Sequence, residues 1–130
     1  MATRLCSEVC EAGTAPAGLI LTSTFSSMLD TAAWHYPVFP VRLLLRDRFE
    51  SEKRIASVSC PLFQIHGTRD SIVPFELGRK LFAAAPKRSA NMIEKKFLEL
   101  PHAEHNGISR GMFREVISEF FAQIDFSRSQ

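Results

Sequence analysis

Two polar loops hold the side chains of this sequence that are best suited to acid–base chemistry. The first loop contains His66 and Asp70, and the second contains His102 and His105. An aspartate that accepts a hydrogen bond from an imidazole fixes the tautomer of the ring and stabilises its protonated form. An Asp–His pair taken from these loops could therefore act as the base of a nucleophilic mechanism if the fold brings the loops together.

The expected secondary structure does bring the loops together. Apolar runs predict strands, and apolar residues spaced by one helical turn predict helices. The strands are expected over residues 18–24, 62–66 and 95–100, and the main helices over 1–11, 75–85 and 109–124. Alternating strands and helices predict an α/β fold with a parallel sheet of about three strands. Functional groups in such sheets gather beyond the carboxyl ends of the strands, where Asp70 and His105 would be neighbours.

Length, composition and charge limit the classes of protein to which the chain can belong. Its 130 residues predict one domain over residues 1–126, followed by a frayed tail over 127–130. A formal charge of +2 is too small to predict nucleic-acid binding. The basic residues Arg42, Arg46 and Arg54 alternate with acidic ones, which favours a solvated face over an anion site. No apolar run reaches the ~20 residues of a membrane-spanning helix.

The three cysteines, Cys6, Cys10 and Cys60, are predicted to be reduced thiols. Cys6 and Cys10 lie one helical turn apart, which suits one face of the first helix. Arg4 and Glu8 interrupt the early apolar positions, so no secretory signal peptide is visible and we expect a cytoplasmic protein with buried thiols. A metal site would need more Cys or His at ligand spacing, and we predict neither a metal nor a cofactor.

Two segments resemble the catalytic loops of α/β-hydrolases. The run PLFQIHGTRDSIVPFELGRKLF resembles the acid-bearing segment of this family, with an apolar strand, a His-Gly pair and then Asp70. The run FLELPHAEHNGI resembles the family's histidine loop and places His105 at the histidine position. The runs GLILTSTFSSM and HYPVFPVRLLLRDRF resemble the part that follows the nucleophile helix in the α/β-hydrolase-domain, serine-aminopeptidase-like branch.

The resemblance implies a serine hydrolase in which His105 is the base and Asp70 orients it. The parent reaction would be hydrolysis of an ester, thioester or amide of a small-molecule acyl substrate through an acyl-enzyme, without a metal or organic cofactor. The family order is Ser, Asp, His, with the serine in a Gly-x-Ser-x-Gly elbow, and we recognise no such elbow here. The opening ATRLCSEV resembles the helix that follows the elbow. We therefore expect a C-terminal portion that begins past its nucleophile, lacks the oxyanion hole and is inactive alone.

Each candidate residue also has an alternative interpretation. Asp70 could cap a turn, and His102 could be the base in place of His105 or could form a metal pair with it. His66 is predicted to be structural. The family usually has glycine at the positions of His102 and Glu104, so the histidine loop could be shifted. The remaining candidates are Ser23, Ser26 and Ser27 as substitute nucleophiles, where loop bonding or capping is favoured, and Trp34, His35 and Tyr36 as pocket residues, where core packing is favoured.

The alternative function, from a different class, is a non-catalytic binding or regulatory module derived from the same fold. The strand over residues 18–24 bears on this choice, because in the family sheet it lies beside the strand that leads into the nucleophile. GLILTST holds no proline or charge to blunt an open edge. We expect several of Leu19, Ile20 and Leu21 to lose cover. The isolated chain should then be aggregation-prone, self-associate through this edge, or need the missing N-terminal half supplied in trans.

Overall fold

The computed structural model describes residues 2–38, 40 and 51–128, and its backbone confirms the expected α/β architecture. Three parallel strands form one sheet in the order β1-β2-β3. The strands are β1 (Leu19–Thr22), β2 (Leu62–Gly67) and β3 (Lys96–Leu100). The central strand, β2, is buried along its whole length, as expected for a parallel strand covered on both faces.

The helices lie where the sequence predicts them. They are α1 (Ala2–Glu11), α2 (Met28–His35), α4 (Ser51–Ile55), α5 (Phe75–Ala84) and α6 (Arg110–Arg128). Ser27 caps α2, because its hydroxyl accepts a hydrogen bond from the Asp30 amide at 2.9 Å. Arg42 and Arg46, which are predicted to belong to a solvated face, fall outside the described residues.

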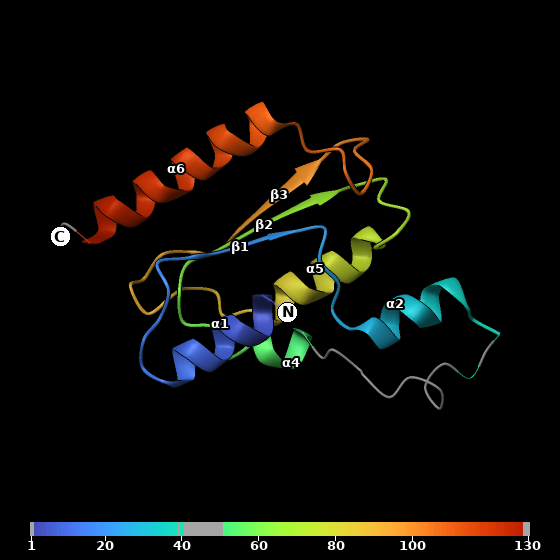
Figure 1. Ribbon diagram of the computed structural model, residues 1–130, viewed down its shortest axis with the longest axis horizontal. Helices are drawn as coiled ribbons and strands as arrows, with labels where there is room; N and C mark the ends of the chain where they lie inside the picture. The colour runs from blue at the N-terminus through green and yellow to red at the C-terminus, as the bar shows by residue number, and fades with distance from the viewer. Residues whose placement is uncertain (1, 39, 41–50, 129–130) are drawn as a thin grey trace.

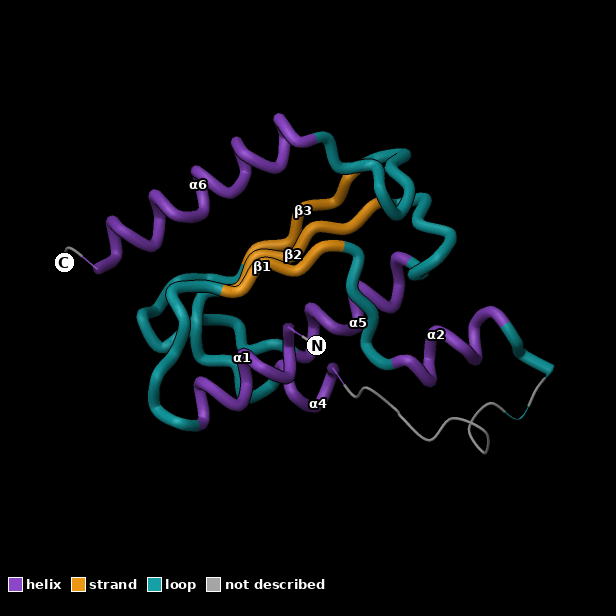
Figure 2. Tube along the Cα trace, viewed as in Figure 1, coloured by secondary structure: helices purple, strands orange, loops and turns teal. Residues whose placement is uncertain are grey.

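The helices cover both faces of the sheet and give three layers. Figures 1 and 2 show α6 on one face and α1, α4 and α5 on the other. Leu62 of β2 packs with Leu81 of α5 in one core. Phe63, the next residue, packs in the second core against Phe120 of α6, with ring centroids 5.5 Å apart. Alternate residues of β2 therefore face opposite helical layers, as the pleat of a strand requires.

The side chains of β1 are better covered than the sequence predicts. Leu19 and Leu21 are 7% and 2% exposed, because Ile55 and Val58 join α1 in covering them. The prediction that several of these side chains would lose cover is therefore wrong for the two leucines, and Ile20 is partly buried in the other core. In the described part of the chain β1 still pairs with β2 alone, so one edge of β1 is open.

The buried face of α6 differs from the predicted stripe at one end. Phe120 and Ile124 are buried as expected, but Met112 is 41% exposed. Phe113 packs toward the core in its place. A spacing of four residues exceeds the 3.6 residues of a helical turn, so a stripe extended over three turns drifts around the helix. The helix also continues to Arg128, and so includes the start of the predicted tail.

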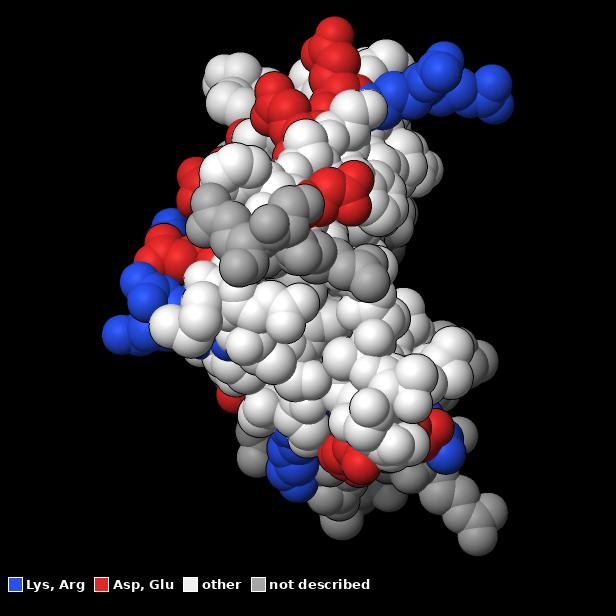
Figure 3. Space-filling model, turned by 90° about the vertical axis from the view of Figure 1, so that its left-hand side faces the viewer, with Lys and Arg blue, Asp and Glu red and all other residues white. Residues whose placement is uncertain are grey.

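Figure 3 shows basic and acidic side chains at several separate places on one face, with uncharged surface between them. Elsewhere the signs are paired directly, since Lys80 lies 2.9 Å from Asp30 and 3.0 Å from Glu52. None of the helices in the described ranges combines the length and apolar character needed to cross a bilayer.

Candidate active site

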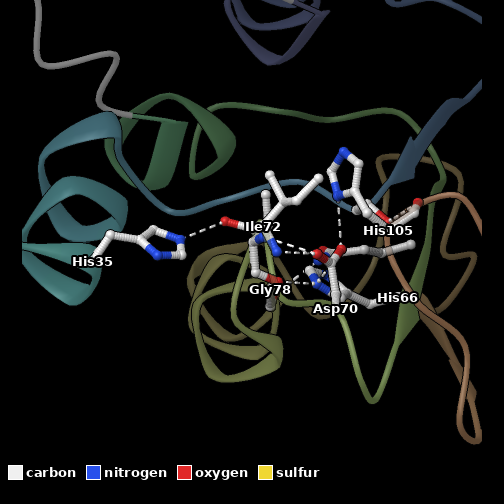
Figure 4. Close-up of polar contacts among 9 residues, drawn as sticks. His35, His66, Asp70, Ile72, Gly78 and His105 are labelled. Carbon is white, nitrogen blue, oxygen red and sulfur yellow. Dashed lines mark hydrogen bonds and ion pairs between the residues drawn. The ribbon is translucent and has the colours of Figure 1, made fainter.

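The loops after β2 and β3 bring Asp70 and His105 into contact, which confirms the predicted juxtaposition. Nδ1 of His105 lies 2.8 Å from Oδ2 of Asp70 (Figure 4). The ionised carboxylate can only accept, so Nδ1 carries the proton, and Nε2 of the neutral ring keeps its lone pair free. Figure 4 shows this second nitrogen pointing away from Asp70. The Asp70 side chain is completely buried, whereas that of His105 is 30% exposed, so the pair presents a basic nitrogen at an accessible position.

Hydrogen bonds hold Asp70 in its charged form. Oδ1 accepts from the amides of Ile72 at 3.0 Å and Val73 at 2.8 Å, while Oδ2 accepts from His105. Burial alone would raise the pKa of this carboxyl, but the hydrogen bonds from Val73, His105 and Ile72 outweigh burial and lower it below the usual value of an aspartate. An ionised carboxylate is the state that can orient the imidazole and stabilise its protonated form.

Three hydrogen bonds join the acid loop to the histidine loop independently of the Asp–His contact. The Thr68 amide donates to the Leu100 carbonyl at 3.0 Å, and the Arg69 amide donates to the Ala103 carbonyl at 3.0 Å. The His102 amide donates to the Thr68 hydroxyl at 2.9 Å. The backbone of one loop is therefore fixed to the other, which holds their side chains in register.

Two residues show how closely these loops approach. A Cβ on Gly67 would lie 2.3 Å from the Ala103 carbonyl oxygen, so only glycine fits there. His102 has a φ of 61°, in the left-handed region that favours glycine, which agrees with the glycine usual at this family position. The loop nevertheless keeps His105 on Asp70, and His102 itself is exposed. Of the two candidate bases, the structure therefore pairs His105 with the acid.

His66 is a second histidine beside Asp70, a position that the sequence pattern did not reveal. Its ring is fully buried, and Nε2 lies 3.0 Å from the Val73 carbonyl and 3.5 Å from Oδ2 of Asp70. A carbonyl only accepts, so Nε2 carries the proton, and Nδ1 has no hydrogen-bond partner. The ring lies against Gly78, where a Cβ would come within 2.2 Å of Nδ1. His66 therefore holds the turn that carries Asp70, in keeping with its predicted structural role.

The cluster Trp34-His35-Tyr36 lies at the surface, so the favoured interpretation of core packing is wrong. Trp34 and Tyr36 are 57% and 59% exposed. His35 contacts the acid loop, because its Nε2 lies 2.9 Å from the Ile72 carbonyl (Figure 4). Ile72 donates its own amide to Asp70. The end of α2 therefore supports the acid loop from outside, a contact that no local pattern could predict.

The three serines considered as substitute nucleophiles have structural partners. The Ser26 hydroxyl donates to Oδ2 of Asp30 at 2.9 Å, and Ser27 caps α2. Ser23 has a φ of 46°, and its hydroxyl donates to the backbone carbonyl of His105 at 3.2 Å. Among the described residues, none of these three hydroxyls forms a recorded hydrogen bond with the ring of His105. They therefore act as cap and loop residues, as favoured from the sequence.

A Gly-x-Ser-x-Gly match is present at residues 107–111, so the absence expected from the sequence is wrong for the bare pattern. Its serine, Ser109, does not follow a strand, and its hydroxyl accepts a hydrogen bond from the Met112 amide at 3.2 Å at the start of α6. Ser109 has no positive φ. A nucleophile elbow is a strained turn between a strand and a helix. Ser109 therefore matches the letters of the motif without its structural context.

A hollow of about 270 Å³ adjoins His105. Its lining combines polar and apolar side chains from the end of β1, the histidine loop and the start of α6, namely Thr22, His105, Asn106, Ile108, Arg110 and Phe113. Ser109 is not part of this lining. The hollow leaves space beside His105 for a reacting group supplied from elsewhere.

Comparison with curated sequences gives relatives that are longer than this chain. No protein-family model matches. Uncharacterized protein Rv2307c of Mycobacterium tuberculosis is 42% identical over 91 residues, which cover 70% of this chain and 30% of that protein. Lysophosphatidylserine lipase ABHD12 of Macaca fascicularis is 35% identical over 112 residues, which cover 75% of this chain and 28% of the lipase. The chain thus spans less than a third of the length of these relatives.

Solved structures share the fold over nearly the whole chain. The esterase domain of a Rhodothermus marinus protein superposes with a TM-score of 0.61 at 17% identity, covering 92% of this chain and 56% of that one. Alpha/beta hydrolase domain-containing protein 10 from mouse gives a TM-score of 0.57 at 15% identity, covering 93% of this chain and 57% of that one. Identities this low bear on the fold alone. The three strands and the helices that cover them correspond to part of the α/β fold of these larger chains.

Proposed function

The chain belongs to the α/β-hydrolase superfamily, and from that premise we propose that it supplies the acid and the base of a serine-hydrolase triad. The observation that carries the proposal is the 2.8 Å hydrogen bond between His105 and the buried carboxylate of Asp70. Two further features support it, namely the lowered pKa of Asp70 and the hollow beside His105. The whole protein would hydrolyse an acyl ester, thioester or amide, with a small-molecule ester favoured by the name of the ABHD12 relatives.

The proposed reaction needs a serine hydroxyl in the hollow next to His105. Nε2 takes the hydroxyl proton as the serine oxygen bonds to the acyl carbon, and Asp70 stabilises the imidazolium that forms. His105 returns this proton to the leaving alcohol, thiol or amine as the scissile bond breaks. Water then attacks the acyl-enzyme, again giving its proton to Nε2, and the acid product leaves as the serine recovers its proton. The family places this serine ahead of the elements described for this chain.

Labelling with a fluorophosphonate probe tests the proposal. The chain alone should remain unlabelled, since Ser23, Ser26, Ser27 and Ser109 act as cap or loop residues. A fusion that places the region preceding the match in the mycobacterial relative before Met1 should be labelled with loss of fluoride. We expect His105→Ala to abolish that label, and His102→Ala, which changes an exposed neighbour in the same loop, to leave it intact.

Two outcomes of this labelling would contradict the proposal. If the chain alone is labelled stoichiometrically and Ser23→Ala or Ser109→Ala removes the label, the nucleophile lies within the chain. If the fusion folds but is labelled equally with and without His105, the Asp–His pair does not activate a serine. The second result would favour the alternative of a non-catalytic module that binds through the same surface.

We propose that the nucleophile-bearing strand pairs with the open edge of β1. When that strand is absent, the same edge of a second copy of the chain would pair there. The amides of Leu19 and Ser23 donate toward β2, to the carbonyls of Pro61 at 2.8 Å and Ile65 at 3.0 Å. Amides alternate in direction along a strand, so that of Thr22 faces the open side. An unprotected edge of this kind favours pairing with another strand.

Sedimentation velocity over a range of protein concentrations tests this pairing. We expect the sedimentation coefficient of the isolated chain to rise with concentration. Thr22→Pro removes the outward amide and should lower the association constant by about tenfold, the effect of losing one net hydrogen bond of ~1.4 kcal/mol. Thr22→Val keeps the amide and serves as the control. A chain that is monomeric at every concentration would show that the edge is protected.

A further inference from the structure

The fold gathers all three cysteines of the chain at one point. Cys6 and Cys10 lie on one face of α1, and Cys60 lies two residues before the start of β2. The Sγ atoms lie within 4.8 Å of one another, and those of Cys6 and Cys60 are 3.5 Å apart. Cys6 and Cys60 are buried, whereas Cys10 is partly exposed. The sequence spacing suggested a pair on one helix, and the packing of α1 beside β2 adds a third thiol.

The separations of these sulfurs suit a shared metal ion. A zinc–thiolate bond is about 2.3 Å long, which places the sulfurs of a tetrahedral site about 3.8 Å apart and those of a trigonal site about 4.0 Å apart. Both distances lie between the 3.5 Å that separates the sulfurs of Cys6 and Cys60 and the upper limit of 4.8 Å for the whole cluster. A disulfide would need a sulfur separation of about 2.05 Å and would use only two of the three thiols. Convergence of all three on one point therefore fits coordination better than oxidation.

We propose that Cys6, Cys10 and Cys60 form a three-thiolate site for a thiophilic metal ion, with Zn²⁺ as the expected occupant. Zinc bound by three protein ligands keeps a fourth position for water or another donor. Cys10 is partly exposed, and Cys60 lines a hollow of about 310 Å³. The ion would fasten α1 to the segment that enters β2.

The surroundings of the three thiols shift their pKa values in different directions. Burial raises the pKa of Cys6 and Cys60. Burial acts in the same direction on Cys10, but hydrogen bonds from the Ser59 hydroxyl and from the amides of Ser59 and Cys60 outweigh it and lower its pKa. Each thiol releases a proton to solvent as its sulfur binds the ion, so the affinity falls as the pH falls.

Titration of the reduced chain with Co²⁺, a spectroscopic substitute for Zn²⁺, tests the proposal. We expect a near-ultraviolet sulfur-to-cobalt charge-transfer band and the visible bands of a low-symmetry site, both saturating at one ion per chain and removed by Zn²⁺. Cys10→Ser is the variant that least disturbs the core, since Cys10 is only partly buried. Cys10→Ser should lower the affinity for Co²⁺ by more than about 100-fold. Loss of a group that only supports a metal ligand typically lowers metal affinity by about 10–100-fold.

His105→Ala is the control, because it removes a side chain of a type that can bind metals but lies outside the cluster, and it should leave the bands unchanged. Absence of a charge-transfer band, or its survival in Cys10→Ser, would overturn the proposal, as would its loss in His105→Ala. A second measurement uses the unaltered chain alone and does not depend on any variant folding. With Zn²⁺ present, the reaction of native thiols with a disulfide reagent should slow by at least about tenfold, and an unchanged rate would also overturn the proposal.

Discussion

Replacing His105 by alanine should lower the kcat of ester hydrolysis by about 10⁴–10⁶-fold in the fusion that supplies a nucleophile. The variant loses the group that accepts the serine proton, and any remaining rate comes from the oxyanion hole and substrate binding. Asp70→Asn should cost about 10⁴-fold, because an amide nitrogen facing Nδ1 favours the wrong tautomer. Both rates are measured by stopped-flow or steady-state hydrolysis of a p-nitrophenyl ester at saturating substrate.

The control for this series is His102→Ala, in which the kcat should stay within a few-fold of the unaltered fusion. His102 is exposed, whereas His105 contacts the acid. The double variant Asp70→Asn, His105→Ala should be little worse than His105→Ala alone, since the two residues act as one unit. Losses that simply multiply in the double variant would mean that Asp70 and His105 act independently, and the proposed triad would be wrong.

Gly78→Ala should cost the chain about 1–3 kcal/mol of unfolding free energy, or prevent folding altogether. In an ordinary helix this substitution stabilises by up to ~1 kcal/mol. Here the added Cβ would lie 2.2 Å from Nδ1 and 2.6 Å from Cε1 of His66. The ring cannot move aside, because it is fully buried and stacks edge-on against Phe75 with centroids 5.8 Å apart. Urea unfolding followed by circular dichroism measures the change.

Gly111→Ala provides the matched comparison for Gly78→Ala, because Gly111 also lies within a helix and has no atom near its added Cβ. It should raise the unfolding free energy by up to ~1 kcal/mol. The two glycine substitutions should therefore act in opposite directions. An equal gain at both positions would show that α5 does not approach β2 as closely as the structure indicates.

The elements that rest on local patterns were predictable from the sequence. The apolar run at residues 62–66 produced a buried central strand, and the spacing in 75–85 produced an amphipathic helix. The contact between Asp70 and His105 was predictable as well, although 35 residues separate them. Parallel strands carry their carboxyl ends to the same edge of a sheet, so topology alone brings their loops together. The catalytic roles of the two residues stay predictions.

Features that depend on how the elements pack could not be predicted in the same way. Cys60 lies 54 residues from Cys6, and their approach depends on where α1 crosses the sheet. The contact of His66 with Gly78 depends on the distance between α5 and β2, which no single-helix pattern encodes. The exposure of Met112 depends on the rotation of α6 about its own axis. In each case two elements had to be placed before the contact existed.

The hydrogen bonds between the acid and histidine loops have a consequence for the timing of entropy loss. The amides of Thr68 and Arg69 fix the loop positions through backbone contacts, and the carboxylate of Asp70 orients the ring of His105. The rotational freedom of the imidazole is therefore largely lost when the chain folds and not again at each turnover. The imidazole is therefore already oriented when a nucleophile binds beside it. Ordering of the ring would then contribute little to the activation entropy of proton transfer.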